Sequence, residues 1–91
     1  MANTNVSVLI PLDVYIKFVK REIRPSDLKM ALQPPESLDG VKPFPDRQVI
    51  YKEMYMPVWF KDWYRNLDRT DRLRFATIIY ERLNQMLGGV A

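Results

Sequence analysis

Proline constrains this chain more than any other residue, because it lacks an amide donor and interrupts both helices and the interiors of sheets. Seven prolines occur in the 91 residues, and four of them fall within residues 34–45. That stretch is therefore predicted to be an extended, proline-rich connection, and connections of this length are often functional or flexible. Pro11, Pro25 and Pro57 fit the entry to a helix, where a backbone donor is not needed.

The N-terminal third predicts a short strand followed by two helices. Residues 5–10 alternate with a period of two, as in a strand with one face buried. Residues 12–23 carry an apolar stripe at helical spacing, with basic residues on the opposite face. A second, short helix is predicted over residues 26–33, with Ser26 as a possible N-cap, and the two prolines that follow must end it.

The C-terminal half is aromatic-rich and is predicted to be helical. Residues 46–56 fit two interpretations: a helix that buries Ile50 and Met54, which we favour, and a strand, because residues 48–55 are also strand-like. Residues 57–67 carry one apolar helical face, formed by Trp59, Phe60, Trp63, Tyr64 and Leu67. Residues 69–87 give the strongest helical pattern, with Asp68 as N-cap and Gly88 as C-terminal stop.

The predicted fold class is mainly α: a short N-terminal β-strand followed by a small helical bundle with a C-terminal antiparallel helical hairpin. Residues 1–91 are expected to form a single small domain, in which helices 57–67 and 69–87 make the hairpin and helix 12–23 covers its apolar side. The predicted strand has no partner in this scheme. Because an unpaired strand edge invites pairing with another chain, a homodimer through residues 5–10 is a reasonable hypothesis.

The composition argues against catalysis and against a metal or cofactor. The chain contains no cysteine and no histidine, the commonest metal ligands and general bases. Asp68 and Asp71 could be a pair of catalytic carboxylates, but capping and the helix dipole explain them at the start of a helix. We therefore do not expect an enzyme. The N-terminal residues lack the features of a secretory signal and no apolar run could span a membrane, so a cytoplasmic location is expected.

Aromatic density indicates a binding function. Residues 44–64 hold seven of the eleven aromatic residues, more than a core of this size needs to hide. Although core packing accounts for many of them, Tyr51, Tyr55 and Met56 are candidates for a docking surface. A second candidate surface joins Arg74, Ile78 and Arg82 on the last helix. The predicted function is a non-catalytic protein–protein interaction module, a small regulatory or inhibitory factor whose partner is another protein.

Residues 5–23 support an alternative. This segment resembles the opening of ribbon–helix–helix DNA-binding proteins, in which a short alternating strand leads through a Pro-Asp-like start into an amphipathic helix. The resemblance implies a dimeric DNA-binding regulator whose paired strands enter the major groove. Asn5, Ser7 and Leu9 would then face the bases. Binding would also draw on the basic helix face, at Lys17, Lys20 and Arg21, and the net charge of +3 permits an acidic partner.

Overall fold

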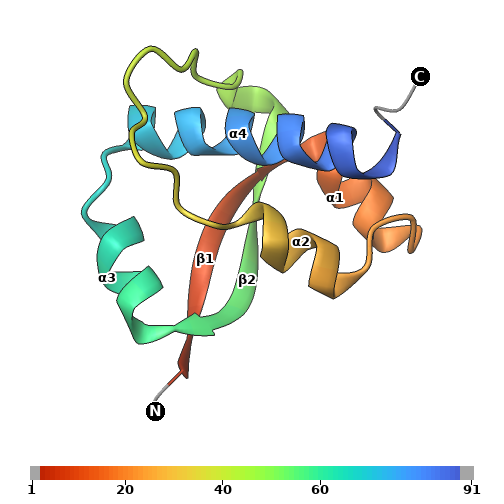
Figure 1. Ribbon diagram of the computed structural model, residues 1–91, viewed down its shortest axis with the longest axis horizontal. Helices are drawn as coiled ribbons and strands as arrows, with labels where there is room; N and C mark the ends of the chain where they lie inside the picture. The colour runs from red at the N-terminus through yellow and green to blue at the C-terminus, as the bar shows by residue number, and fades with distance from the viewer. Residues whose placement is uncertain (1–2, 89–91) are drawn as a thin grey trace.

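A two-stranded antiparallel sheet runs through the centre of the molecule, and helices cover one of its faces (Figure 1). The computed structural model describes residues 3–88. In chain order the elements are β1 (Asn3–Pro11), α1 (Leu12–Val19), α2 (Pro25–Ala31), the 3-10 turn η1 (Asp46–Gln48), β2 (Val49–Pro57), α3 (Val58–Arg65) and α4 (Arg69–Leu87). The two strands pair along their whole length, from Asn3 opposite Pro57 to Pro11 opposite Val49.

The main core lies between the sheet and helices α2 and α4. Val6, Val8 and Ile10, the alternating apolar residues of β1, form the inner face of the sheet and are buried. They belong to one apolar cluster with Leu28 of α2 and with residues of α4 that include Ile79 and Leu83. Alternation with a period of two thus places one side of β1 in the core, as expected for a sheet covered on one face.

Helix α3 completes the core with aromatic side chains. Phe60 and Tyr64, four residues apart on α3, are both buried and stack with their ring centroids 5.8 Å apart. Phe75 of α4 packs against both, and the Trp63 ring meets Phe75 edge to face at 5.1 Å. This cluster joins α3 to the first half of α4 beside β1.

The predicted ends of α4 are confirmed. Asp68 is the N-cap, and its carboxylate accepts a hydrogen bond from the Asp71 amide at 2.7 Å. The Asp71 carboxylate in turn pairs with Arg74 at 2.6 Å, while Gly88 is the C-cap. Both acidic residues therefore have structural partners at the helix start.

The proline-rich connection is held along α4 by hydrogen bonds to its backbone. Arg74 donates to the Val41 carbonyl at 3.0 Å, and the Thr77 hydroxyl donates to the Lys42 carbonyl at 2.7 Å. The Phe44 amide donates to the Leu73 carbonyl at 3.0 Å, and the Phe44 ring lies 5.4 Å from that of Tyr80. The segment has no regular structure between α2 and η1, but its position is fixed by these contacts.

Helix α1 ends at Val19, four residues before the predicted limit of 23. The chain leaves the helix through Arg21, which has a positive φ of 65°. The Arg21 amide donates to Phe18 at 3.1 Å and the Glu22 amide to Lys17 at 2.8 Å, the pattern of a Schellman C-cap. Ser26 is likewise not a cap: α2 begins at Pro25, and the N-cap position is Arg24.

The predicted fold class is wrong, because residues 46–56 form mostly a strand instead of a helix. Residues 49–57 become β2 and supply the partner that β1 lacked, so the fold is an antiparallel sheet with four helices and not a strand preceding a helical bundle. The predicted helical hairpin is also absent. Helix α3 is set at a steep angle to α4, and α4 instead lies across the sheet beside α2 (Figure 1).

Candidate functional site

The outer face of the sheet carries two exposed tyrosines. Residues of β2 alternate between faces, so Tyr51, Glu53 and Tyr55 share the side opposite the core. The relative exposure of Tyr51 is 55% and that of Tyr55 is 59%. Both were predicted to belong to a docking surface, and the structure brings them together on one strand. Exposed tyrosines are a residue type that contributes strongly to protein interfaces.

The edge of β2 that faces away from β1 is unpaired. The Leu9 amide points away from β2, because it donates to the Tyr64 hydroxyl, so Leu9 and Tyr51 form a non-hydrogen-bonded pair. In an antiparallel ladder such pairs alternate with hydrogen-bonded ones. Tyr51, Glu53 and Tyr55 therefore direct their N–H and C=O groups outward. Within residues 3–88, no strand pairs with this edge.

The corresponding edge of β1 is closed at Leu9. The Leu9 amide donates to the Tyr64 hydroxyl at 3.0 Å, and the relative exposure of Tyr64 is 2%. Burial raises the pKa of Tyr64 to about 12, although the hydrogen bond from Leu9 and the charge of Arg72 act in the opposite direction. The phenol thus stays protonated at neutral pH and occupies the strand edge as a neutral group.

The start of β2 is tied to the start of α4 through Arg69. Arg69 forms an ion pair with Asp46 of η1, including a hydrogen bond of 3.1 Å from its Nε. The hydrogen bond to Asp46, together with a smaller contribution from Tyr51, raises the pKa of Arg69. This pair holds the turn before β2 in place and lies next to the first of the two exposed tyrosines.

The other predicted interface residues serve the fold. Met56 is buried, and Ile78 packs against the core cluster. Arg74 binds the Val41 carbonyl, and Arg82 donates to the carbonyls of Ala31, at 3.0 Å, and Gln33. The surface formed by Arg74, Ile78 and Arg82 stays a prediction; in the structure the segment that follows α2 folds back over α4 and accepts hydrogen bonds from both guanidinium groups.

The two tryptophans of α3 have different environments. Trp63 packs against Phe75, but Trp59 is 56% exposed on the adjoining face of α3. Trp59 borders a shallow hollow of about 230 Å³ together with Lys29 and Gln33 near the end of α2. The aromatic helical face was predicted as a unit, whereas only part of it reaches the interior.

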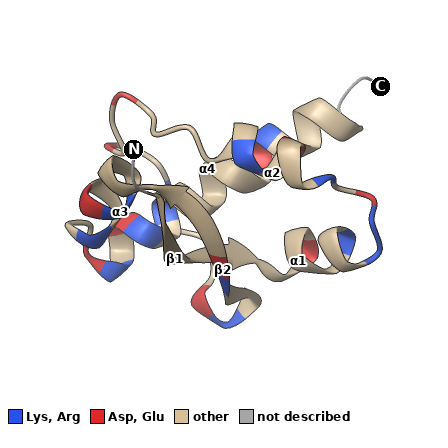
Figure 2. Cartoon of the chain, turned by 90° about the horizontal axis from the view of Figure 1, so that it is seen from below, with Lys and Arg blue, Asp and Glu red and all other residues tan. Residues whose placement is uncertain are grey.

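The residues predicted to bind DNA are dispersed. Asn5 and Ser7 are exposed on the outer face of the sheet, but Leu9 is 1% exposed and cannot face a base. Lys20 and Arg21 lie in the turn after α1, where Figure 2 shows basic and acidic residues close together. The strand that was expected to pair with a second copy already pairs with β2.

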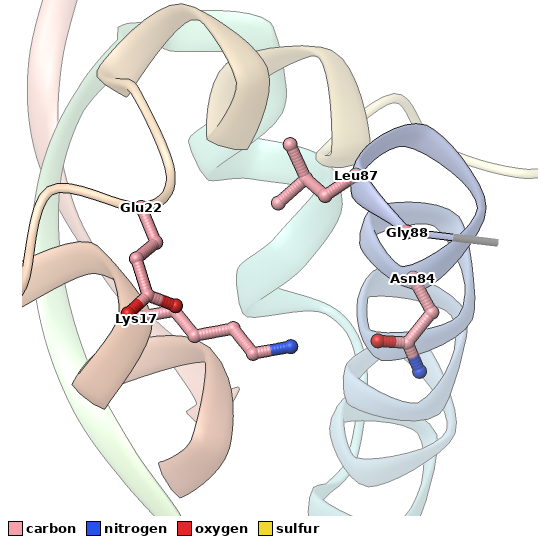
Figure 3. Close-up of a pocket in the computed structure, with 5 residues that line it drawn as sticks. All are labelled: Lys17, Glu22, Asn84, Leu87 and Gly88. Atoms are coloured by element: carbon pink, nitrogen blue, oxygen red, sulfur yellow. The ribbon is translucent and has the colours of Figure 1, made fainter. Parts of the chain in front are cut away.

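Lys17 lines a cavity of about 440 Å³ between α1 and the end of α4. Its ammonium group extends toward the Asn84 side chain, and the Glu22 carboxylate lies on the same side of the cavity (Figure 3). Leu87 and Gly88 complete the lining. The opposite charges of Lys17 and Glu22 leave this cavity without a net preference for an anion.

A second cavity of about 440 Å³ was not predicted from the sequence. It lies between α1, the turn that leads to α2, and β2. Its lining combines apolar side chains with three cationic ones: Tyr15, Phe18, Val19, Ile23, Pro25, Arg21, Arg24 and Lys52. The available signal was the basic run around Pro25, but its closeness to Lys52 depends on β2, which was predicted to be helical.

Among residues 3–88, no group of three or more acidic side chains could hold a metal ion, and no helix is long and apolar enough to cross a membrane. Tyr51 and Tyr55 are exposed on β2, and Asn5 and Ser7, predicted to contact DNA, are exposed on the same outer face of the sheet. Comparison with known protein families, curated proteins and solved structures finds no significant match to this chain.

Proposed function

We propose that this protein is a non-catalytic binding module that captures another protein by adding one of that partner's strands to the free edge of β2. The observation that carries the proposal is the unpaired edge of β2 between two tyrosines that are each more than half exposed. In strand addition, main-chain hydrogen bonds supply affinity, and alternate side chains supply specificity. A small factor with such a surface would act by occupying its partner.

The geometry of β2 suits this role. The strand has nine residues, and it directs the backbone groups of Tyr51, Glu53 and Tyr55 outward. A strand added there would place every second side chain on the outer face, beside the two tyrosines. Aromatic side chains bring large contact area to such pairs at a low entropic cost.

Proline at position 53 tests the edge directly. Glu53→Pro removes an outward donor and leaves the ladder to β1 intact, whereas Lys52→Pro removes a donor that bonds to β1. We expect Glu53→Pro to stay folded and to lose partner binding, with Glu53→Ala as the matched control that keeps the donor. Lys52→Pro should destabilise the fold by about 1–3 kcal/mol, because a ladder acceptor on β1 loses its donor.

Photo-crosslinking identifies the partner without assuming what it is. A benzoylphenylalanine replacing Tyr55 should crosslink to one protein in cell extract, and Glu53→Pro should abolish that product. The same probe replacing Glu81, an exposed residue of α4, serves as the control. A product at Glu81 that Glu53→Pro does not affect, with none at Tyr55, would contradict the proposal. A crosslinked dimer would make a second copy of this chain the partner.

A DNA-binding function would give different results with the same protein and its Glu53→Pro variant. Affinity for a mixed-sequence duplex would fall steeply as salt rises, because bound phosphates release counterions. It would depend on Lys20 and Arg21 and be indifferent to Glu53→Pro. Such a result would favour the predicted DNA-binding alternative over strand addition.

A further inference from the structure

The cavity beside Lys52 combines an apolar floor with a positive charge. Its lining contains five apolar or aromatic residues, three cationic ones and no acidic one. Ligand sites commonly have this composition, a concave apolar surface with a few charged groups that orient the ligand. The cavity between α1 and the end of α4 has the same size but includes both Lys17 and Glu22.

The three cations of this cavity are largely free to accept an anion. Among residues 3–88, neither Arg21 nor Lys52 forms an ion pair, and Arg24 meets Asp27 only at 3.4 Å with its own side chain mostly exposed. The Lys52 ammonium lies 5.2 Å from the centroid of the Phe18 ring, so an aromatic face, and no carboxylate, is its neighbour.

Arg21 occupies a position that glycine normally takes. Its φ of 65° lies in the left-handed region, where a side chain is disfavoured and where Schellman motifs usually place glycine. The chain nevertheless places a long cationic side chain there, at the rim of the cavity. Strained residues of this kind concentrate at functional sites.

The cavity borders the strand whose edge is free. Lys52 belongs to β2, and its side chain is on the inner face, between the outward-facing Tyr51 and Glu53. A strand added to β2 would direct alternate side chains to this same inner face, with the opposing residue about 5 Å from Lys52 between Cβ atoms. Such a side chain would enter the space between β2 and α1.

We infer that the partner segment that adds to β2 carries an acidic side chain on its inner face, seated between Lys52 and Arg21, with an apolar side chain two residues away against Phe18. The inference rests on the proposed function and specifies the chemistry of the partner. Charge complementarity supports it, because the cavity presents only positive charge and the apolar lining suits the stem of a glutamate or an aliphatic residue two positions along the strand.

Selection from a display library of random nine-residue peptides tests the inference. Baits are the wild-type protein, Glu53→Pro, Lys52→Met, Arg21→Gly and the double charge reversal Lys52→Glu with Arg21→Glu. Lys61→Met is the matched control, because Lys61 is an exposed lysine of α3 away from the cavity. Circular dichroism of each bait verifies its fold before selection.

We expect wild-type and Lys61→Met baits to select alternating peptides enriched in Asp or Glu at one position. A selected peptide should bind about fivefold more tightly than its amide analogue, the effect of a partly exposed charge contact. Lys52→Met and Arg21→Gly should lose that preference, and the double reversal should select Lys or Arg instead. Glu53→Pro should select no strand peptides.

The outcomes separate this inference from the proposed function. Peptides that disappear with Glu53→Pro but show no acidic preference would overturn the inference and leave strand addition standing. An acidic preference that survives Lys52→Met and Arg21→Gly would also overturn it. Peptides that bind Glu53→Pro as well as wild type, or a library without any enriched peptide, would overturn both.

Discussion

The two edges of the central sheet differ in whether their outward backbone groups have a hydrogen-bond partner. At the edge of β1, the buried Tyr64 hydroxyl accepts a hydrogen bond from the Leu9 amide. At the edge of β2, Tyr51, Glu53 and Tyr55 direct backbone groups outward, and no strand among residues 3–88 pairs with them. Free edges are a hazard that proteins usually cover, shorten or charge. The proposed strand addition would use the open edge of β2.

The difference lies in side chains more than in backbone. Both strands have nine residues and share one register. Polar Asn5 and Ser7 lie opposite Tyr55 and Glu53 on the outer face, so the exposed aromatic area lies mostly on β2. At the edge of β1, the Leu9 amide is hydrogen-bonded to one hydroxyl, that of Tyr64, within an aromatic cluster. Removing that cluster should make the two edges alike.

The largest effect is expected from Phe60→Ala. Phe60 is fully buried and contacts Tyr64 and Phe75, so its removal leaves a cavity that costs about 3–5 kcal/mol of unfolding free energy. Urea unfolding followed by tryptophan fluorescence measures the loss. Hydrogen exchange should also quicken at the Leu9 amide and stay unchanged, already fast, at Tyr51 and Glu53. Slow exchange at those two amides in the wild type would contradict an open β2 edge.

The second-largest effect is expected at alkaline pH, where deprotonation of Tyr64 should lower the free energy of unfolding. Burial raises the pKa of Tyr64 from its ordinary value of 10.0 to about 12, so the folded protein binds this proton more tightly than the unfolded chain. The corresponding stability is fully present below pH 10 and is lost as pH rises through 12, by about 3 kcal/mol in total. Chemical denaturation at several pH values measures it.

Tyr64→Phe is the reference for that titration. The variant should be about 1–3 kcal/mol less stable at neutral pH, because the Leu9 amide loses its acceptor. Its disadvantage relative to wild type should shrink between pH 10 and pH 12. A stability difference that stays constant across this range would show that Tyr64 does not titrate as the buried group described above.

Arg21→Gly should stabilise the protein by about 0.5–1 kcal/mol, since glycine removes the steric cost of the left-handed conformation. Lys20→Gly is the matched control. Lys20 has an ordinary φ of −77°, so glycine there should destabilise by a similar amount. Thermal unfolding distinguishes the two. A destabilised Arg21→Gly would mean that the arginine side chain contributes more to folding than its backbone conformation costs.

The smallest effect on stability is expected from Tyr55→Thr. Its side chain is mostly exposed, and threonine keeps a strand-forming residue, so unfolding free energy should change by less than about 0.5 kcal/mol. Partner binding, measured with the crosslinked protein once it is known, should fall. A large loss of stability with unchanged binding would place Tyr55 in the fold instead of the interface.

Local patterns predicted the elements whose periodicity is unambiguous. The alternation in residues 5–10 and the capped pattern of residues 69–87 correspond to β1 and α4. The helix predicted over residues 46–56 is wrong. Ile50 and Met54 are four residues apart, and this spacing places two side chains on the same face both in a helix and in a strand. The Val, Ile and Tyr residues of that stretch were the signal for a strand, and β1 was the partner that decided it.

The candidate site could be predicted from the sequence only where its residues lie on one secondary-structure element. Tyr51 and Tyr55 lie on a single strand, and their exposure follows from one alternation. Arg74 and Arg82 could not be assigned, because their acceptors lie in residues 31–41, far away in sequence. The cationic cavity joins α1 to β2, so it becomes visible only when the sheet is formed.

The pairing of β1 with β2 also bears on how the chain folds. Even the pair of strand residues closest in sequence, Pro11 and Val49, is separated by α1, α2 and the proline-rich segment. The sheet is thus not a local hairpin. Its first contact must close a long loop, and the entropic cost of that closure arises before any ladder of hydrogen bonds can offset it. Helix α4, whose backbone hydrogen bonds are local, can form earlier. We expect the sheet, and with it the free edge of β2, to appear last, so a nascent chain would not present that edge until folding is nearly complete.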